Sequence, residues 1–258
     1  MQKIDIIHEP TNSEPFVIIN KPSGMPSAPL EASDKDNALC HAAKCFPEIL
    51  SVNGIKNIEC GLLHRLDTVT SGLILIATTQ EFYDFLQKEQ KEGKFIKTYT
   101  AKSMYIKNNP QILEGFPVCN YINQFESFNS KTNDLNFCVE SFFRPYGLGS
   151  KLVRPVTAES GMAALKKCGK KIYSTNINVS FLCNDNNVSL FDVKCKISAG
   201  FRHQVRCHLA WVGLPIIGDN LYNSYEVQNP TSEKKIEFVA SSIEFTNPIT
   251  NKRVVFEL

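Results

Sequence analysis

Continuous apolar runs bounded by turn residues set the pattern of the first hundred positions. Residues 16–20 (FVIIN) and 72–77 (GLILIA) are apolar almost throughout and have the length of strands, which predicts two buried strands. Residues 95–101 predict a third strand. Between the first two, apolar positions at helical spacing predict a helix over residues 36–46, ended by Pro47.

Cap and turn residues divide the rest of the chain. Thr78 and Glu81 form a capping box that predicts the start of a helix, and Gly93 closes it. Residues 172–181 and 190–197 predict paired strands around a turn at 184–187, residues 203–212 a helix, and residues 236–245 and 253–256 further strands. Because strands outnumber helices and mostly do not alternate with them, we expect an α+β fold with a mixed, mainly antiparallel central β-sheet and flanking helices.

The stretch from about residue 103 to residue 155 differs from its surroundings. It is rich in Asn, Ser and aromatic residues and has no clear period. We therefore expect one domain over residues 1–258, with an insertion or an elaborated loop region at about 103–155. A length of 258 residues fits one large domain of this kind.

The charge balance limits the kind of partner. The 28 basic and 26 acidic residues leave a formal charge of +2, so a nucleic-acid site must be a local basic cleft and not a basic tail. No C-x-x-C pair occurs among the nine cysteines, which gives a zinc site no support and favours reduced thiols. With no export signal, transit peptide or membrane-length apolar run, we expect a cytoplasmic protein without a membrane partner.

The densest group of polar residues lies at positions 61–72, directly before an apolar strand. His64, Arg65 and Asp67 fall within four positions, and Thr70, Ser71 and Gly72 follow. A loop at a strand end is a common place for catalytic groups. On composition alone, an ordinary turn with a solvated Arg–Asp pair is the more frequent explanation, since structural ion pairs also gather charges.

Four sequence segments that match one known family in the same order favour a catalytic loop over an ordinary turn. His64-Arg-Leu-Asp67 followed by Thr70-Ser-Gly72 resembles the H-R-L-D-x-x-T-S-G signature of the RluA-type pseudouridine synthase family. Residues 17–26 (VIINKPSGMP) resemble its first strand and K-P-x-G loop, Lys97-Thr-Tyr99 with Ala101 resembles its K-x-Y-x-A strand, and residues 200–222 resemble its G-R-x-H-Q to G-D-x-x-Y segment.

Two positions depart from the family pattern. Phe201 stands where the family has an arginine after the glycine, with Arg202 one place later, and Val69 stands where the family tends to have an acid. The first departure moves the local arginine by one position along the chain. Neither touches the residues to which the resemblance assigns chemistry.

The resemblance implies an isomerase with the pseudouridine synthase catalytic fold that needs no cofactor and no metal. Asp67 is then the catalytic carboxylate, which either attacks a sugar carbon or removes the C2′ proton. Arg206 is implied as the partner that keeps this acid ionised. Tyr99 is implied to stack on the flipped uracil and to assist removal of the C5 proton, the alternative being a strand aromatic facing the core.

Four further residues are implied to bind substrate. Arg65 fills the stack that the target base vacates and holds a phosphate, or else makes a structural salt bridge. Lys21, Arg202 and His203 contact backbone phosphate or shape the site. For Lys21 a solvated surface position is equally compatible with the sequence, and His203 is compatible with a hydrogen bond within the fold.

These expectations combine into an RNA pseudouridine synthase that acts as a monomer on a uridine in a structured RNA, a stem-loop of rRNA or tRNA. The alternative is a non-catalytic RNA-binding or RNA-folding protein on the same scaffold. The joint presence of Asp67, Tyr99 and Arg206 argues against it, because binding alone needs no carboxylate facing a phosphate-rich partner. A glycoside hydrolase or nucleosidase would normally use two cooperating carboxylates, and the motif offers one.

Overall fold

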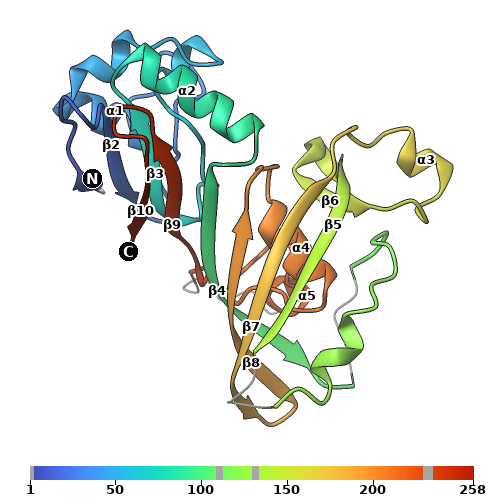
Figure 1. The fold of residues 1–258 in the computed structure, drawn as a ribbon. Coiled ribbons are helices and arrows are strands. Elements are labelled where there is room, and N and C mark those ends of the chain that lie inside the picture. Colours follow the sequence, from blue (N-terminus) through green and yellow to red (C-terminus); the bar gives the residue numbers. More distant parts are fainter. Residues whose placement is uncertain (1–2, 109–112, 130–133, 229–234) are drawn as a thin grey trace. The chain divides into compact units, whose positions relative to one another are not determined.

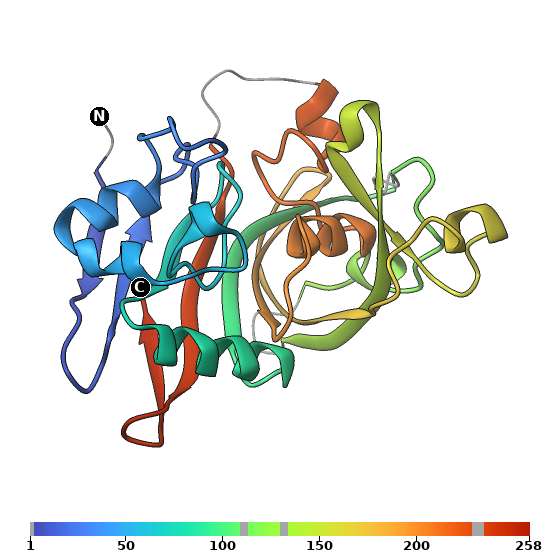
Figure 2. The same cartoon turned by 90° about the horizontal axis from the view of Figure 1, so that it is seen from above.

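The computed structural model describes residues 3–108, 113–129, 134–228 and 235–258, and the chain packs as two compact units (Figures 1 and 2). The first unit comprises Met1–Thr98 and Val239–Leu258, and the second comprises Tyr99–Phe238. Strand β4 (Ile96–Ile106) begins in the first unit and continues in the second. Each unit has its own hydrophobic core.

The first unit is built on a mixed sheet. Strands β1 (Asp5–His8), β2 (Phe16–Lys21) and β3 (Ser71–Ala77) pair antiparallel in chain order. Strand β9 (Phe238–Asn247) lies parallel to the start of β3 and antiparallel to β10 (Lys252–Glu257). Helices α1 (Ala38–Cys45) and α2 (Gln80–Lys91) and the short 3-10 turns η1 (Pro47–Ser51) and η2 (Asn57–Glu59) complete this unit.

The core of the first unit explains why strands β2 and β3 are almost entirely apolar. Their residues Val17, Ile19, Ile74 and Ile76 are buried, and so are the neighbours that point to the other side. One cluster joins these strands to α2 and β9 through aromatic and aliphatic side chains. Its buried members are Phe16, Ile18, Val52, Leu63, Leu73, Leu75, Ala77, Phe82, Tyr83, Leu86, Phe95, Ile243 and Phe245.

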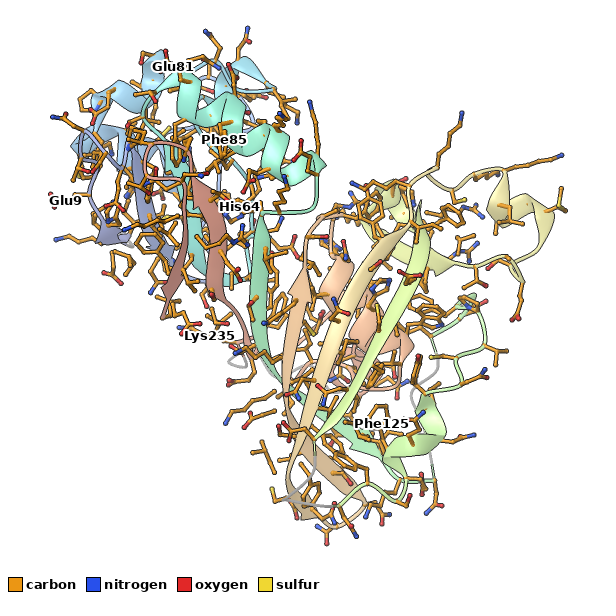
Figure 3. All side chains as sticks on the ribbon, viewed as in Figure 1. Glu9, His64, Glu81, Phe85, Phe125 and Lys235 are labelled. Atoms are coloured by element: carbon orange, nitrogen blue, oxygen red, sulfur yellow. The ribbon has the colours of Figure 1, made fainter. Side chains whose placement is uncertain are left out.

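The second unit is a sheet with the strand order β4-β8-β7-β5-β6. Strands β5 (Leu135–Tyr146), β7 (Tyr173–Asp185) and β8 (Val188–Ile197) are long, and β6 (Leu152–Val156) is a short edge strand. The pairs β5–β6, β5–β7 and β7–β8 are all antiparallel. Between the strands lie η3 (Ile122–Phe125), which carries the buried Phe125 labelled in Figure 3, η4 (Leu148–Ser150) and α3 (Met162–Leu165).

Helix α4 (Gln204–Trp211) is buried along its whole length, and α5 (Ser224–Gln228) follows it. A buried cluster that contains Cys207 and Ala210 joins α4 to Phe143 of β5 and Val153 of β6. A helix buried on every side has no amphipathic period of its own. None of the helices in the described ranges has the length and apolar character needed to cross a membrane.

The α+β prediction with a mixed, mainly antiparallel sheet is confirmed. Strands β5 and β6, which the sequence pattern did not predict, fall in the stretch 103–155 except for Val156 at the end of β6. The capping box placed the start of α2 one residue too early. Thr79 is the N-cap and accepts a hydrogen bond from the backbone N–H of Phe82 at 3.4 Å, so Glu81 does not occupy the reciprocal position.

Candidate active site

The loop that carries Asp67 enters strand β3 through a tight turn. The Thr70 N–H donates to the Asp67 carbonyl at 3.0 Å, and the Asp67 side chain is half-buried. The carboxylate therefore stands on a backbone that is fixed locally and keeps access to solvent. Loops positioned by a rigid sheet are typical carriers of catalytic groups.

Three residues of the K-P-x-G loop and one residue shortly after it hold this turn, and we call them the Asp67 clamp: Lys21, Ser23, Gly24 and Ser27. The Ser27 hydroxyl donates to the Leu66 carbonyl at 2.8 Å and accepts from the Leu66 N–H at 3.0 Å.

On the other side of Asp67, the Gly24 N–H donates to the Thr68 carbonyl at 2.7 Å and the Ser23 hydroxyl donates to the Val69 carbonyl at 2.6 Å. The backbone is thus fixed immediately before and after the acid. Positioning of this kind is what a catalytic carboxylate requires.

Lys21 is fully buried, and its ammonium group completes the clamp. It donates to the carbonyls of Pro22 at 2.9 Å, Met25 at 2.7 Å and Thr68 at 3.2 Å. Burial lowers the pKa of Lys21 to about 8, and the nearby negative charge of Asp67 acts in the opposite direction.

An ammonium group has three protons, and three protein carbonyls accept them. The solvated position that the sequence also allowed is therefore wrong. A phosphate contact by Lys21 finds no support in this geometry, which makes Lys21 a positioning residue whose charge lies near Asp67.

Gly72 explains the end of the T-S-G signature. It pairs with Ala240 across the parallel β3–β9 contact and has φ +120°, in the region that favours glycine. A Cβ at this position would lie 2.3 Å from the Ala240 carbonyl oxygen. The close approach of the two strands therefore requires glycine directly after the loop that carries Asp67.

The two residues before Leu66 point to different environments. His64, labelled in Figure 3, accepts a hydrogen bond from the Leu75 N–H at 3.3 Å. Burial, with a smaller effect of the Lys97 charge, holds the pKa of His64 well below 6.5, so the ring is neutral. Arg65 is exposed and pairs with Glu59 at 3.0 Å, and this Glu59 partner replaces the solvated Arg–Asp pair that composition alone favoured.

Tyr99 lies on β4 in the second unit, with 8% of its surface exposed. Its ring stacks on Phe238 with centroids 5.2 Å apart and an interplanar angle of 15°. One ring face is therefore occupied within the protein. The assignment of Tyr99 to the substrate stays a prediction.

Arg206 on α4 has a partner that the sequence did not suggest. It is 2% exposed, and its Nε and Nη2 donate to the two carboxylate oxygens of Asp219 at 2.8 and 2.7 Å. Asp219 also accepts from the backbone N–H groups of Leu221 and Tyr222. The G-D-x-x-Y segment at residues 218–222 therefore orients the guanidinium group, a role that the sequence motif alone does not state.

His203 and Arg202 precede α4. His203 has φ 56° at the N-cap, and its Nδ1 lies 3.0 Å from the Tyr222 hydroxyl, which also accepts from the Val153 N–H. This is the hydrogen bond within the fold that the sequence left open. Arg202 is exposed, and its guanidinium group donates to the carbonyls of Ser150 and Leu152. The phosphate contacts expected of both residues stay predictions.

The predicted residues thus fall into two groups. Lys21, Arg65 and Asp67 belong to the first unit, where Lys21 and Asp67 share one loop cluster. Tyr99, Arg202, His203 and Arg206 belong to the second unit, where His203 and Arg206 both contact Tyr222. Over the ranges that the structure describes, no group of three metal-ligating side chains gathers.

Asp67 thus lies shortly before a buried strand of a mixed, mainly antiparallel sheet, and hydrogen bonds hold the peptide groups on both sides of it. The model of the RNA pseudouridylate synthase family matches residues 15–211, and the chain belongs to this family. Within it, the chain is of the RluA type, as its relatives indicate.

Three curated relatives illustrate the similarity. The tRNA pseudouridine(31) synthase of Saccharomyces cerevisiae is 27% identical over 235 residues, which are 91% of this chain and 50% of that protein. The dual-specificity RNA pseudouridine synthase RluA of Salmonella typhi is 27% identical over 95% of this chain and 89% of its own. The ribosomal large subunit pseudouridine synthase D of Zymomonas mobilis is 24% identical over 98% and 68%. The chain therefore spans half the length of the yeast relative.

Two solved structures share the fold. Human RNA Pseudouridylate Synthase Domain Containing 1 aligns with a TM-score of 0.65 and 15% identity, over 99% of this chain and 83% of that one. Human RNA Pseudouridylate Synthase Domain Containing 4 aligns with a TM-score of 0.58 and 17% identity, over 98% and 88%. At these identities the likeness concerns the fold alone.

Proposed function

We propose that this protein isomerises a uridine in a structured RNA to pseudouridine, with Asp67 as the catalytic carboxylate. The observation that carries the proposal is the Asp67 clamp. Hydrogen bonds from residues 21–27 fix the backbone on both sides of one half-buried acid, and a buried ammonium group lies near it. A binding surface gains nothing from a carboxylate so placed.

The reaction breaks the N1–C1′ bond of the target uridine and forms a C5–C1′ bond. The proton on C5 leaves and N1 gains one, so atoms and electrons balance without an external reactant. Asp67 takes part either by attack on the sugar or by removal of the C2′ proton, and both roles require the ionised acid. A cation near the carboxylate stabilises that form.

We assign two cations to this task. Lys21 lies near Asp67 in the first unit, where the two charges interact. Arg206 is retained as the partner from the second unit, and its pairing with Asp219 supports a fixed orientation for its guanidinium group. Tyr99 is proposed to contact the flipped uracil, and Arg65, Arg202 and His203 to contact the RNA backbone.

The substrate is proposed to be a stem-loop of tRNA or rRNA. The names of the relatives cover both classes, a tRNA position in yeast and the ribosomal large subunit in Zymomonas mobilis. We further propose that residues 1–258 form a single catalytic domain elaborated at about 103–155, that no cofactor is needed, and that the protein acts as a cytoplasmic monomer.

Asp67→Asn tests the proposal, because the amide keeps the shape of the side chain and removes its charge and basicity. We expect pseudouridine formation on total RNA to fall by about 1,000-fold or more, the combined effect of losing nucleophile and base. RNA binding, measured separately, should stay within about threefold of wild type, a change of less than 1 kcal/mol. Asp185→Asn, which changes an exposed acid at the end of β7, is the matched control.

Two results would contradict the proposal. Near-normal turnover by Asp67→Asn would remove the catalytic assignment. Wild-type protein that binds RNA and forms no pseudouridine in total RNA from cells lacking the protein would favour the non-catalytic RNA-binding alternative.

A further inference from the structure

Positive charge is concentrated in one part of the second unit, which we call the basic segment (residues 144–171). It contains seven basic residues and one acidic residue, a formal charge of +6 in a chain whose total is +2. The remainder of the chain is therefore net negative. A local excess of this size marks the electrostatic footprint of a polyanion site.

Most of this charge lies on exposed side chains. The run at residues 166–171 (KKCGKK) holds four lysines in six positions, and all four are exposed. In the part of the chain that the structure describes, none of them makes an ion pair with an acid. In Figures 1 and 2 the stretch around α3, which immediately precedes this run, projects from the strands of the second unit.

A pair of like charges in the sheet also indicates a site for an anion. Arg144 of β5 and Arg154 of β6 are directly opposite each other in the antiparallel register. Like charges in this position destabilise a sheet, and an acid between them would be the usual compensation. Neither arginine forms an ion pair within the described ranges, which leaves the compensation to an external anion.

Aromatic rings accompany the charges. The Arg154 guanidinium carbon lies 5.5 Å from the centroid of the Tyr146 ring, and Phe116 meets Tyr146 edge-on at 6.4 Å. A cavity of about 460 Å³ lies beside Arg154, between residues 115–118 and 154–164, and Phe116 and Pro155 line it. Basic groups interleaved with aromatic faces suit a nucleic acid, which offers phosphates and bases together.

The segment is tied to the sheet and is not a loose tail. The Gly169 N–H donates to the Phe143 carbonyl of β5 at 3.0 Å, which anchors the lysine run. Arg202 donates to the carbonyls of Ser150 and Leu152 and so fixes the β5–β6 connection. A surface that is held in place loses little entropy when it binds.

We propose that the basic segment binds backbone phosphates of the substrate RNA, in addition to the contacts made at the Asp67 loop. The RNA identity of the polyanion rests on the proposed function. Lysines arranged in this way neutralise phosphates without reading sequence, so the segment supplies affinity and orientation and not the choice of uridine. Its ligand is double-stranded RNA of the stem that presents the target.

The experiment compares two full-length variants that lose the same charge. The test variant replaces the four exposed lysines of the run by glutamine: Lys166, Lys167, Lys170 and Lys171. The control variant replaces four exposed lysines of the first unit by glutamine: Lys44, Lys88, Lys91 and Lys252. Binding of each protein to a fluorescein-labelled RNA duplex of arbitrary sequence is measured by anisotropy over a range of salt concentrations.

We expect the test variant to bind the duplex at least about tenfold more weakly than wild type at moderate salt, and the slope of log K against log salt to become shallower by about 2 or more. The control variant should change the affinity by less than about threefold, since scattered surface charges contribute little specific binding. Equal losses in both variants, or an unchanged slope in the test variant, would overturn the proposal.

Two further measurements separate the sources of failure. The first compares wild type and the test variant on phosphatidylcholine vesicles that contain phosphatidylserine. If only wild type binds the vesicles while both proteins bind the duplex equally well, the segment belongs to a membrane surface and the RNA proposal is overturned. Because the duplex assay needs no turnover, a protein that forms no pseudouridine but shows the expected loss of binding would overturn the proposed function alone.

Discussion

Lys21→Met tests whether the Asp67 clamp serves catalysis, because methionine keeps most of the side-chain volume and removes the ammonium group. The carbonyls of Pro22 and Met25 lose their donor, whereas Thr68 keeps the Gly24 N–H. At about 1–3 kcal/mol for each buried unsatisfied group, the two carbonyls destabilise the fold by about 2–6 kcal/mol.

An opposing effect offsets most of this loss. The pKa of Lys21 falls from 10.5 to about 8, so burial disfavours the charged form by about 3 kcal/mol, and methionine avoids that penalty. The net loss in the free energy of unfolding is then between about −1 and 3 kcal/mol. The effect on turnover should be larger than the effect on stability. Without the ammonium group the Asp67 loop loses part of its support, and a shift of about 1 Å in a catalytic group lowers the rate by about 100-fold.

The assay measures release of tritium from RNA labelled at uridine C5, at several RNA concentrations. A positioning role lowers kcat and leaves KM nearly unchanged, whereas a phosphate contact raises KM. Lys91→Met, at an exposed position of the same unit, is the control. A kcat within about threefold of wild type, a change of less than 1 kcal/mol in the barrier, would refute the role assigned to the clamp.

Lys21 also predicts a pH dependence of stability. Its folded pKa of about 8 lies below the unfolded value of 10.5, so the unfolded chain binds the proton more tightly between these values. The wild type should therefore gain stability relative to Lys21→Met as pH rises from 8 to 10.5, by at most about 3 kcal/mol. Chemical denaturation of both proteins at the two ends of this range measures the difference, and parallel curves would contradict it.

Two other predictions concern the cores of the units. Gly72→Ala should lower the free energy of unfolding by about 2–6 kcal/mol, from backbone strain and the clash with Ala240. Gly161→Ala is the control and should change it little, because nothing lies within 4 Å of the added Cβ. Equal melting temperatures of the two variants would contradict the close approach of β3 and β9. His208 is buried between the hydroxyls of Ser141 and Thr175, and burial lowers its pKa to about 3 from 6.5. Stability should therefore fall as pH drops from 6.5 towards 3, by at most about 4–5 kcal/mol, and His208→Gln should flatten that dependence; an unchanged acid profile in the variant would contradict the neutral imidazole.

Strands in a uniform environment were the plainest in the sequence, whereas among strands with an exposed face β7 and β8 were predicted and β5 was not. Strands β2 and β3 are buried on both faces, so their sequences are continuously apolar and unmistakable. Strand β5 has one exposed face, and its alternation of Leu135, Phe137 and Val139 with polar residues was available as a signal. Strand β6 contains Pro155, which is compatible with its place at the sheet edge but conceals a strand in the sequence.

The sequence predicted which loop carries the candidate site, but not the hydrogen bonds that hold this loop in place. The H-R-L-D signature singled out Asp67 as the candidate, because the motif specifies the identity of each side chain. The contacts of Lys21 and Ser27 end on backbone carbonyls, which every residue possesses, so no partner residue marks them in the sequence. Asp219 stands in the G-D-x-x-Y segment, but its pairing with Arg206 was not predictable, because no helical or strand period links two residues 13 positions apart.

The use of carbonyl acceptors has an evolutionary consequence. The clamp forms hydrogen bonds to the peptide groups of Thr68 and Val69, not to their side chains. Substitutions at both positions can therefore accumulate while the acid stays in place. Val69, where related enzymes tend to carry an acid, is an instance of this latitude. Divergent members of the family can therefore keep a common geometry at the reacting carbon while the surface next to it adapts to different RNAs.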